Sequence, residues 1–190
     1  MPNVDAKKET QRRVGIAARK ALDEESAQRF SRIIAEKLIA DSAFQRAKIV
    51  LSYQPFAGEV DTSFIHLHAE GAGKTLAFPI CHENGIMVAA IPDAEHVWET
   101  GKYGIKSPIE SRSQIIDPAE IDFVVVPCTA FDGRTRMRIG WGAGCYDRYL
   151  PQCKKAVSIA VAYEGQQVPG LCLDAWDVPL DAVITEAHRY

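Results

Sequence analysis

The sequence predicts a single α/β domain built around a mostly parallel sheet. Three short apolar runs support this prediction, at residues 47–53, 121–127 and 156–162. They are rich in β-branched residues and do not alternate with polar ones, which is typical of strands buried on both faces. Helical or long crossover segments separate them, as parallel strands require. With 190 residues, the chain has enough material for one domain that spans residues 1–190.

The amino-terminal segment predicts an amphipathic helix over residues 5–22. Apolar side chains recur there at helical spacing and form one stripe: Val14, Ala17, Ala18, Ala21 and Leu22. The helical period then places Lys8, Arg12 and Arg19 together on the opposite face. Spacing alone favours a solvated basic face, and we keep that interpretation for Arg19.

Capping and periodicity place the remaining elements. Asp23 is a suitable N-cap for a second helix that ends near residue 40. Another helix is expected over 62–69, and shorter strands at 74–79, 85–91 and 182–184. Residues 93–119 and 128–136 are expected to be irregular. Within the first of these segments, Trp98 is either a stacking wall for a bound ring or an anchor in the core.

Composition excludes several classes of protein. The formal net charge of -3 at pH 7 gives no overall attraction to nucleic acid or to an anionic membrane. No apolar run approaches the roughly 20 residues of a membrane helix, and the charged amino-terminal segment is unlike a secretory signal. The five cysteines form no CxxC pair, so neither a disulfide framework nor a zinc site is expected. We therefore expect a cytoplasmic protein with reduced thiols that binds neither nucleic acid nor membrane.

The segment 138–148 is the most informative stretch of the chain. It contains three alternating glycines: Gly140, Gly142 and Gly144. Glycine lets backbone approach a ligand closely, and consecutive N–H groups in such a loop can bind an anion. A helix that begins near Tyr146 would add partial positive charge at the same place. On composition alone, a simple turn is the more frequent use of such glycines.

This segment also carries a resemblance to a known family. The pattern RxGxGxGxYDR over residues 138–148 is similar to the signature of the 5-formyltetrahydrofolate cyclo-ligases, also called methenyltetrahydrofolate synthetases. Other matches follow in the expected order: the Lys-x-x-x-Arg of Lys8 and Arg12, the sequence EVDT at 59–62, Phe78-Pro79, and the D-x-x-x-D-x-x-I-T-E of residues 177–186. The resemblance covers nearly the whole chain.

The resemblance implies a doubly wound α/β fold with helices on both faces of the sheet, and we expect a monomer. It also implies that ATP and Mg²⁺ drive the conversion of 5-formyltetrahydrofolate to 5,10-methenyltetrahydrofolate, with release of ADP and phosphate. Phosphoryl transfer depends on positioning and charge stabilisation more than on a protein nucleophile. The absence of a convincing Ser/His/Asp or Cys/His arrangement in the sequence agrees with such a reaction.

The resemblance further implies roles for single residues. The ATP phosphates are expected to contact three cations and one loop: Lys8, Arg12, Arg138, Gly140, Trp141, Gly142, Ala143, Gly144, Cys145 and Tyr146. Magnesium is expected at two aspartates, Asp147 and Asp177. The folate is expected to contact Gln54, Glu59 and Tyr146. The residues expected to take part in catalysis are Arg138 and Tyr146.

Four positions depart from the family pattern: Ile80, Ser107, Ala143 and Cys145. They fall around the expected site, so one alternative is an enzyme with the same ATP site that acts on a non-folate acceptor. A non-catalytic nucleotide-binding protein is a further alternative, and the complete set of Lys8, Arg12, Arg138 and Asp147 argues against it. A nucleophilic role is not expected for Cys145.

Overall fold

The computed structural model describes residues 4–93, 95, 98–101 and 104–190. Its main sheet contains β1 (Ile49–Leu51), β2 (Thr75–Cys81), β3 (Met87–Pro92), β6 (Ser113–Ile116), β7 (Phe123–Val126), β10 (Val157–Val161) and β11 (Ala182–Ile184). These seven strands have the order β11-β10-β7-β1-β2-β3-β6. The strands from β11 to β2 are parallel, and β3 is antiparallel to both of its neighbours. The prediction of a mostly parallel α/β sheet is confirmed.

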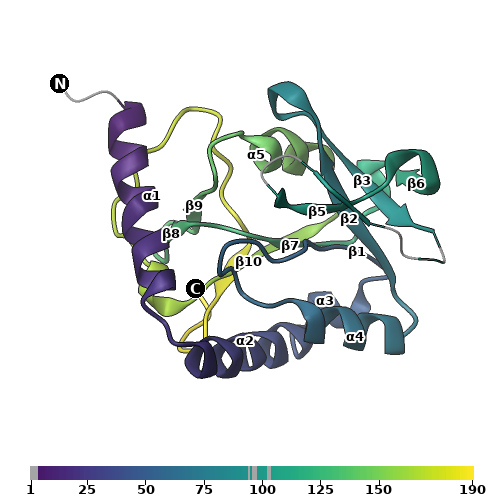
Figure 1. Cartoon of the computed structure of the whole chain (residues 1–190), viewed down its shortest axis with the longest axis horizontal. Helices are drawn as coiled ribbons and strands as arrows, with labels where there is room; N and C mark the ends of the chain where they lie inside the picture. Colours follow the sequence, from purple (N-terminus) through teal and green to yellow (C-terminus); the bar gives the residue numbers. More distant parts are fainter. Residues whose placement is uncertain (1–3, 94, 96–97, 102–103) are drawn as a thin grey trace.

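Helices cover both faces of this sheet, as predicted (Figure 1). One face carries α2 (Glu24–Ile39), α3 (Ser42–Arg46) and α4 (Ser63–Gly71), which run along the bottom of Figure 1. They enclose a core with Phe44 and Phe123 near its centre. The other face carries α5 (Cys145–Tyr149) and the 3-10 turn η5 (Leu150–Gln152), which pack with Leu51 and Val124.

The amino end of α2 is capped as the sequence predicts. The Asp23 side chain accepts a hydrogen bond of 2.8 Å from the backbone N–H of Ser26, one of the donors that a helix leaves unpaired at its start. The remaining short turns are η1 (Glu83–Gly85), η3 (Glu110–Arg112), η4 (Pro118–Glu120) and η6 (Glu164–Gln166). In the part of the chain that the structure describes, no helix is both long and apolar enough to cross a membrane.

The chain reverses its path across the sheet between β1 and β7. It runs from β1 through β2, β3 and β6 to one edge, and then continues with β7, β10 and β11 on the other side of β1. Ligands of open α/β sheets bind in the crevice outside such a switch point, at the carboxyl ends of the strands. Four residues leave the sheet there: Tyr53 and Gln54 after β1, and Pro127 and Cys128 after β7.

Helix α1 (Val4–Lys20) packs on a small second sheet rather than on the main one. This sheet is an antiparallel hairpin of β8 (Ala130–Asp132) and β9 (Met137–Ile139), so the expectation of an irregular loop over 128–136 is wrong. Figure 1 shows α1 upright at the side of the molecule, against this hairpin. The hairpin leads directly into the glycine-rich segment, which therefore starts from a fixed strand.

The face that α1 turns to the hairpin is its basic one. Gly15 and Arg19 are buried on that face, whereas Val14 and Ala17 of the predicted apolar stripe are exposed. The expected orientation of the helix is therefore wrong. The physical reason is that the stripe is mostly alanine, whose burial gains little, while Gly15 allows a close approach of two backbones.

Gly15 fixes the distance between α1 and the hairpin. A Cβ at position 15 would lie 2.0 Å from the carbonyl oxygen of Thr129, which is backbone and cannot rotate away. We expect Gly15→Ala to lower the free energy of unfolding by about 2 kcal/mol, as overpacking does, measured by denaturant titration. Gly165→Ala is the matched control, because its Cβ would meet Ala18 at an ordinary 3.5 Å. Equal effects of the two substitutions would contradict this account.

The segment 93–119 also contains more structure than expected. It forms β4 (Trp98–Thr100), β5 (Lys106–Pro108) and β6, although residues 94, 96–97 and 102–103 lie outside the described part of the chain. Trp98 packs edge-on against Phe78, with 4.8 Å between the ring centroids, and joins the core beneath α4. It is not among the residues that line the cavity described below, so of the two alternatives the core anchor is confirmed.

Candidate active site

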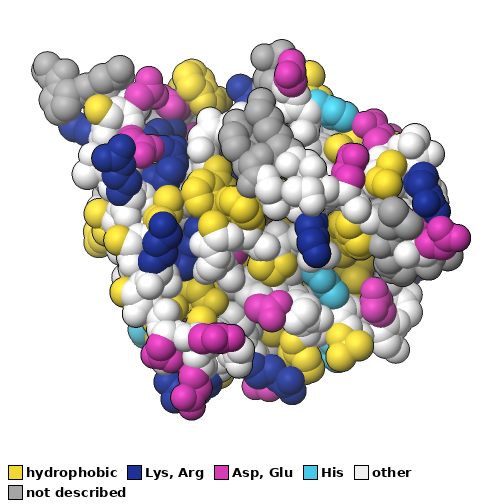
Figure 2. Space-filling view, viewed as in Figure 1, with side chains coloured by type: hydrophobic (Ala, Val, Ile, Leu, Met, Phe, Trp, Pro, Cys, Tyr) yellow, Lys and Arg dark blue, Asp and Glu magenta, His cyan; other side chains and the backbone are white. Residues whose placement is uncertain are grey.

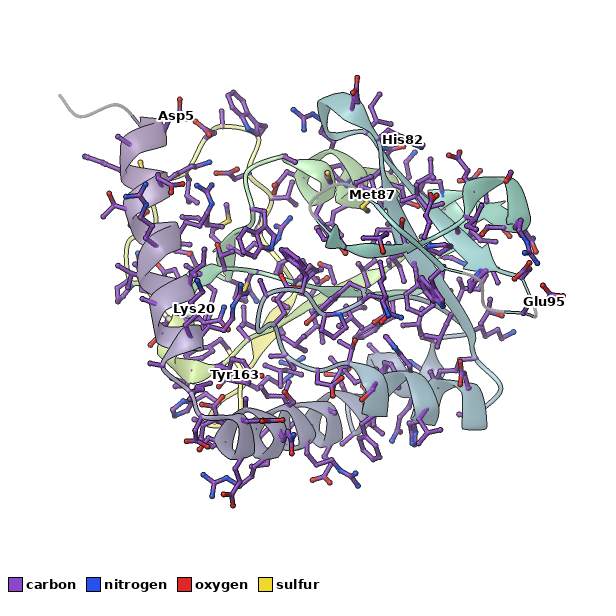
Figure 3. The ribbon with its side chains drawn as sticks, viewed as in Figure 1. Asp5, Lys20, His82, Met87, Glu95 and Tyr163 are labelled. Carbon is purple, nitrogen blue, oxygen red and sulfur yellow. The ribbon has the colours of Figure 1, made fainter. Side chains whose placement is uncertain are left out.

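A cavity of about 1050 Å³ opens at the switch point between β1 and β7. The residues that follow these two strands form its floor, and its walls come from α1, the turn between β2 and β3, and segments 138–148 and 174–177. Asp5 on α1 and His82 in the β2–β3 turn both line it, and Figure 3 shows them on opposite sides of the same edge of the molecule. A cavity of this size holds a drug-sized or nucleotide-sized ligand.

Lys8 connects α1 to the carboxy-terminal wall of the cavity. Its Nζ lies 2.6 Å from Asp174 Oδ2 and 2.5 Å from Asp177 Oδ2. Burial lowers the pKa of Lys8, but the hydrogen bonds that Lys8 donates to these two carboxylates outweigh this effect and raise the pKa above its usual value. Figure 2 shows basic side chains gathered along α1 with acidic ones between them. The structure thus brings Lys8, which is predicted to bind phosphate, into direct contact with Asp177, which is predicted to bind a metal ion.

Arg12 connects α1 to the glycine-rich segment. Its Nε donates a hydrogen bond of 2.8 Å to the carbonyl oxygen of Gly140, and its Nη1 pairs with Glu9. Gly142 has φ of 106° and Gly144 has φ of 67°, a region that favours glycine. Helix α5 follows at once, but it has only five residues, so the dipole predicted for its start is weak. All residues of the predicted loop line the cavity: Gly140, Trp141, Gly142, Ala143, Gly144, Cys145 and Tyr146.

Arg138 and Asp147 form a second charged pair in the same wall. Arg138 extends from β9, is almost fully buried, and places Nη2 3.2 Å from Asp147 Oδ1. Its Nη1 donates to the carbonyl oxygen of Val178 at 3.3 Å, and the N–H of Val178 donates to Asp147 Oδ1 at the same distance. The predicted catalytic cation is therefore fixed in the free protein by an ion pair and a backbone carbonyl, where it lines the cavity.

Tyr146 presents an unpaired polar group to this site. Its hydroxyl is buried and has no hydrogen-bond partner among the described residues. Burial raises the pKa of Tyr146 well above its usual value, so the phenol stays neutral and can donate. The guanidinium of Arg138 lies 5.9 Å from the centroid of its ring. An unpaired buried hydroxyl is unfavourable, and a bound ligand would satisfy it.

Gln54 and Glu59, the predicted folate contacts, line the part of the cavity next to β1. Glu59 Oε1 accepts a hydrogen bond of 3.0 Å from Trp141 Nε1, and Oε2 accepts one of 3.1 Å from the N–H of Phe56. Burial raises the pKa of Glu59, while the hydrogen bond from Trp141 opposes this rise. Trp141, predicted to serve the ATP phosphates, thus has its indole N–H directed to a predicted folate contact.

The carboxylates of the site suit a metal ion that arrives with a phosphate ligand. Among the described residues, no group of three or more His, Cys, Asp or Glu could hold a metal ion. Asp147 and Asp177 each line the cavity beside a cation. Mg²⁺ commonly uses one or two carboxylates and takes its other ligands from phosphates and water. These residues therefore fit Mg²⁺ bound to a nucleotide, and they do not form a complete site of their own.

Two residues of the site were missed or misplaced by sequence reasoning. Asp174 shares Lys8 with Asp177, and its position three residues before Asp177 was the available signal. Arg19, expected on a solvated face, is instead buried, with Nη1 3.8 Å from Glu59 Oε1. No local pattern marks Arg19, because its partner lies on a distant loop.

Of the three cysteines that line the cavity, Cys81 and Cys145 lie next to each other. Cys81 at the end of β2 lies within hydrogen-bonding reach of Cys145 at the start of α5. The hydrogen bond from the Cys81 S–H, supported by the charge of Arg148, lowers the pKa of Cys145 to about 7. The thiolate is the reactive form, and it is populated above the pKa.

We therefore expect Cys145 to react with iodoacetamide at neutral pH before Cys153, which is similarly buried and whose pKa burial raises to about 11, with the rate rising through about pH 7. Peptide mass spectrometry after short exposures measures this order. Cys81→Ala removes the S–H donor and should move the rise in rate to higher pH. A faster reaction of Cys153 at pH 7, or an unchanged profile in Cys81→Ala, would contradict the assignment.

Comparison with known proteins places the chain in a family. The model of the 5-formyltetrahydrofolate cyclo-ligase family matches residues 4–186. The 5-formyltetrahydrofolate cyclo-ligase of Escherichia coli K12 is 30% identical over 173 residues, covering 88% of this chain and 93% of that protein. The mouse protein of the same name is 26% identical over 178 residues, covering 88% of this chain and 87% of its own length.

Solved structures agree with these sequence matches. The NMR structure of Aquifex aeolicus 5,10-methenyltetrahydrofolate synthetase is similar with a TM-score of 0.82 and 31% identity, over 96% of this chain and 91% of that one. The synthetase from Mycoplasma pneumoniae gives a TM-score of 0.77 at 25% identity, over 94% and 98% of the two chains. From its motifs, its fold and these relatives, the chain belongs to the 5-formyltetrahydrofolate cyclo-ligase family of enzymes.

Proposed function

We propose that this protein converts 5-formyltetrahydrofolate to 5,10-methenyltetrahydrofolate in a reaction that requires ATP and Mg²⁺ and releases ADP and phosphate. The observation that carries the proposal is the alternation of cations and carboxylates in one cavity wall: Lys8 with Asp174 and Asp177, and Arg138 with Asp147. Cations of this kind bind phosphate oxygens, and carboxylates bind the Mg²⁺ that accompanies them. The wall is therefore complementary to a magnesium nucleotide.

The free protein already contains the charges that such a nucleotide needs, paired with each other. When the nucleotide binds, its phosphate oxygens take the place of Asp174 and Asp177 at Lys8, and of Asp147 at Arg138. The released Asp147 and Asp177 would hold Mg²⁺, which neutralises charge on the phosphates. This exchange of partners leaves few buried charges unpaired in either state, which keeps both states accessible.

The chemistry requires activation of the formyl oxygen, which is a poor leaving group. Transfer of the γ-phosphoryl group to that oxygen gives ADP and an iminium phosphate. N10 of the folate then attacks the activated carbon, and the N10 proton and phosphate both leave as the ring closes. Arg138 stabilises the charge that develops on the transferring group, and Tyr146 donates its unpaired hydroxyl at the junction of the two substrates. Gln54 and Glu59 orient the folate.

The test is turnover by the purified protein. With ATP, Mg²⁺ and 5-formyltetrahydrofolate together, we expect the absorbance of the methenyl product to rise, and omission of any one of the three should stop it. ADP and methenyl-folate should form in equal amounts. Binding of ATP without turnover of the folate would defeat this proposal.

That outcome would favour a non-folate acceptor for the same ATP site. Of the four departures from the family pattern, Ser107, Ala143 and Cys145 line the cavity, whereas Ile80 is buried in β2 and does not. Screening other formylated amines with ATP, and measuring ADP release, would then identify the acceptor class.

We also propose that the enzyme acts as a monomer in the cytoplasm. Residues from both ends of one chain complete the proposed nucleotide site, so a second subunit is not required. All five cysteines are free thiols, which suits a reducing compartment. Light scattering coupled to size-exclusion chromatography measures the oligomeric state, and a stable dimer would contradict the first part.

A further inference from the structure

Arg19 is a buried cation that the reaction outlined above does not use. Its side chain has no exposed surface, and its Nη1 lies 3.8 Å from Glu59 Oε1 and 3.5 Å from the carbonyl oxygen of Cys128. Its Nε and Nη2 have no hydrogen-bond partner among the described residues. A guanidinium is costly to bury with two unpaired nitrogens, so packing alone does not account for its presence here.

Arg19 contacts three segments that line the cavity. Glu59 belongs to the loop that follows β1, Cys128 follows β7, and Trp141 lies in the glycine-rich segment. The guanidinium carbon of Arg19 lies 5.3 Å from the centroid of the Trp141 ring, a distance at which a cation and an aromatic face attract. The same ring donates its N–H to Glu59. Arg19 therefore supports Glu59 both directly and through Trp141.

Glu59 depends on this support because it is almost fully buried. Burial favours the neutral carboxylic acid, and the carboxylate is favoured by the N–H of Trp141, the charge of Arg19 and the N–H of Phe56. The other titratable groups that face it are Tyr53, Cys128 and Tyr146, and each of them is kept neutral by burial. Arg19 is thus the one full positive charge that favours ionised Glu59 among the described residues.

We propose that Arg19 is a positioning residue that holds Glu59 as an oriented carboxylate, ready to accept hydrogen bonds from N–H groups of the folate heterocycle. This inference rests on the proposed function, because it takes Glu59 as a folate contact. Without Arg19, Glu59 takes up a proton at a higher pH. The O–H of the neutral acid then faces the N–H groups of the folate heterocycle. A donor facing a donor weakens binding, so the loss falls on the folate and not on ATP.

The first experiment measures the protonation of Glu59 without any turnover. Trp141 donates its indole N–H to Glu59, so the ¹⁵N–¹H resonance of this indole reports the charge on the carboxylate. The chain has three tryptophans, and Trp141→Phe assigns the resonance. In Arg19→Gln we expect the midpoint of the pH titration to rise by about one pH unit, as loss of a charge at this distance predicts. Arg19→Lys keeps the charge, so its titration midpoint should lie close to that of the wild-type protein.

The matched control is Arg13→Gln, the same substitution at another arginine of helix α1. Arg13 is exposed, with 77% of its side-chain surface accessible, and pairs with Glu9 at the helix surface. Its substitution should leave the indole titration unchanged. An equal midpoint in Arg19→Gln and Arg13→Gln would overturn the proposal.

The second experiment measures the consequence for folate binding. In Arg19→Gln the KM for 5-formyltetrahydrofolate should rise about tenfold at a pH below both indole midpoints, the effect of roughly one unit in pKa, while the KM for ATP changes less than twofold. The acidic limb of kcat/KM should move upward with the indole midpoint and disappear in Glu59→Gln. The position of this limb does not depend on how much of a variant is folded. A parallel rise in both KM values, or an acidic limb that persists in Glu59→Gln, would assign Arg19 a structural role only.

The two experiments separate the two proposals. If the wild-type protein does not turn over the folate while the indole titration still shifts in Arg19→Gln, the proposed function fails and the electrostatic role of Arg19 stands without its substrate. If the folate is turned over and the titration does not shift, only the inference about Arg19 fails.

Discussion

Replacement of Arg138 by alanine is expected to lower kcat/KM by on the order of 10²-fold or more, as the loss of a preorganised charge-stabilising donor does. Arg138 extends from β9 and is 6% exposed, and its two terminal nitrogens are fixed by Asp147 and the carbonyl oxygen of Val178. A cation positioned in this way before the substrate arrives would stabilise charge on the transferring phosphoryl group once phosphate has replaced Asp147. Alanine removes the charge and also leaves Asp147 without its partner.

Steady-state kinetics with ATP and the folate varied in turn measures this loss. Arg134→Ala on the same hairpin is the control, because Arg134 is exposed, does not line the cavity, and keeps the backbone N–H that donates to Asp132. Arg138→Lys should recover part of the activity, since it keeps the charge and loses the planar fork that suits phosphate oxygens. A change of less than threefold in Arg138→Ala would rule out the catalytic role.

The sheet was predictable from the sequence because its signal is local. The run at 121–127 became β7 and the run at 156–162 became β10, each buried throughout or nearly so. The order of the strands was not predictable in the same way, because pairing joins segments that are far apart in the chain. The switch point, and with it the place of the cavity, follows from that order.

The orientation of α1 shows where hydrophobic periodicity fails. Val14 is 50% exposed, although it belongs to the predicted apolar face. The true inner face carries Gly15, which has no side chain to contribute to such a pattern, and Lys8 and Arg19, which are polar. Arg19 is buried and Lys8 is partly buried, because carboxylates far away in the sequence neutralise them. Periodicity in one helix contains no information about those partners.

The site was predictable where its residues are neighbours in the sequence and less so elsewhere. Arg138 and Asp147 fall within one motif, and the structure pairs them. Lys8 lies 166 residues from Asp174 and 169 from Asp177. Only the fold could therefore reveal that the Lys8 ammonium donates hydrogen bonds to both carboxylates. The resemblance to the family supplied Lys8 and Asp177 separately, and the structure supplied their pairing.

The substitution Asp147→Asn is expected to raise the Mg²⁺ concentration required for half-maximal activity by about tenfold or more, the usual scale for damage to a metal-binding shell. Asparagine keeps an oxygen that can accept the hydrogen bond from the N–H of Val178, so the fold around α5 should be preserved. What it removes is the negative charge that pairs with Arg138 in the free protein and that would hold Mg²⁺ in the complex. A Mg²⁺ titration of turnover at fixed ATP measures the effect.

Glu83→Gln serves as the control for this titration. Glu83 also lines the cavity, but it lies in the exposed turn between β2 and β3 and is not one of the predicted metal ligands. Neutralising it changes the net charge of the cavity by the same amount as Asp147→Asn, so a general electrostatic effect would shift both variants equally. A specific metal contact shifts only Asp147→Asn. Unchanged Mg²⁺ activation in Asp147→Asn would therefore remove this residue from the metal site, and Asp177 would be the carboxylate to test next.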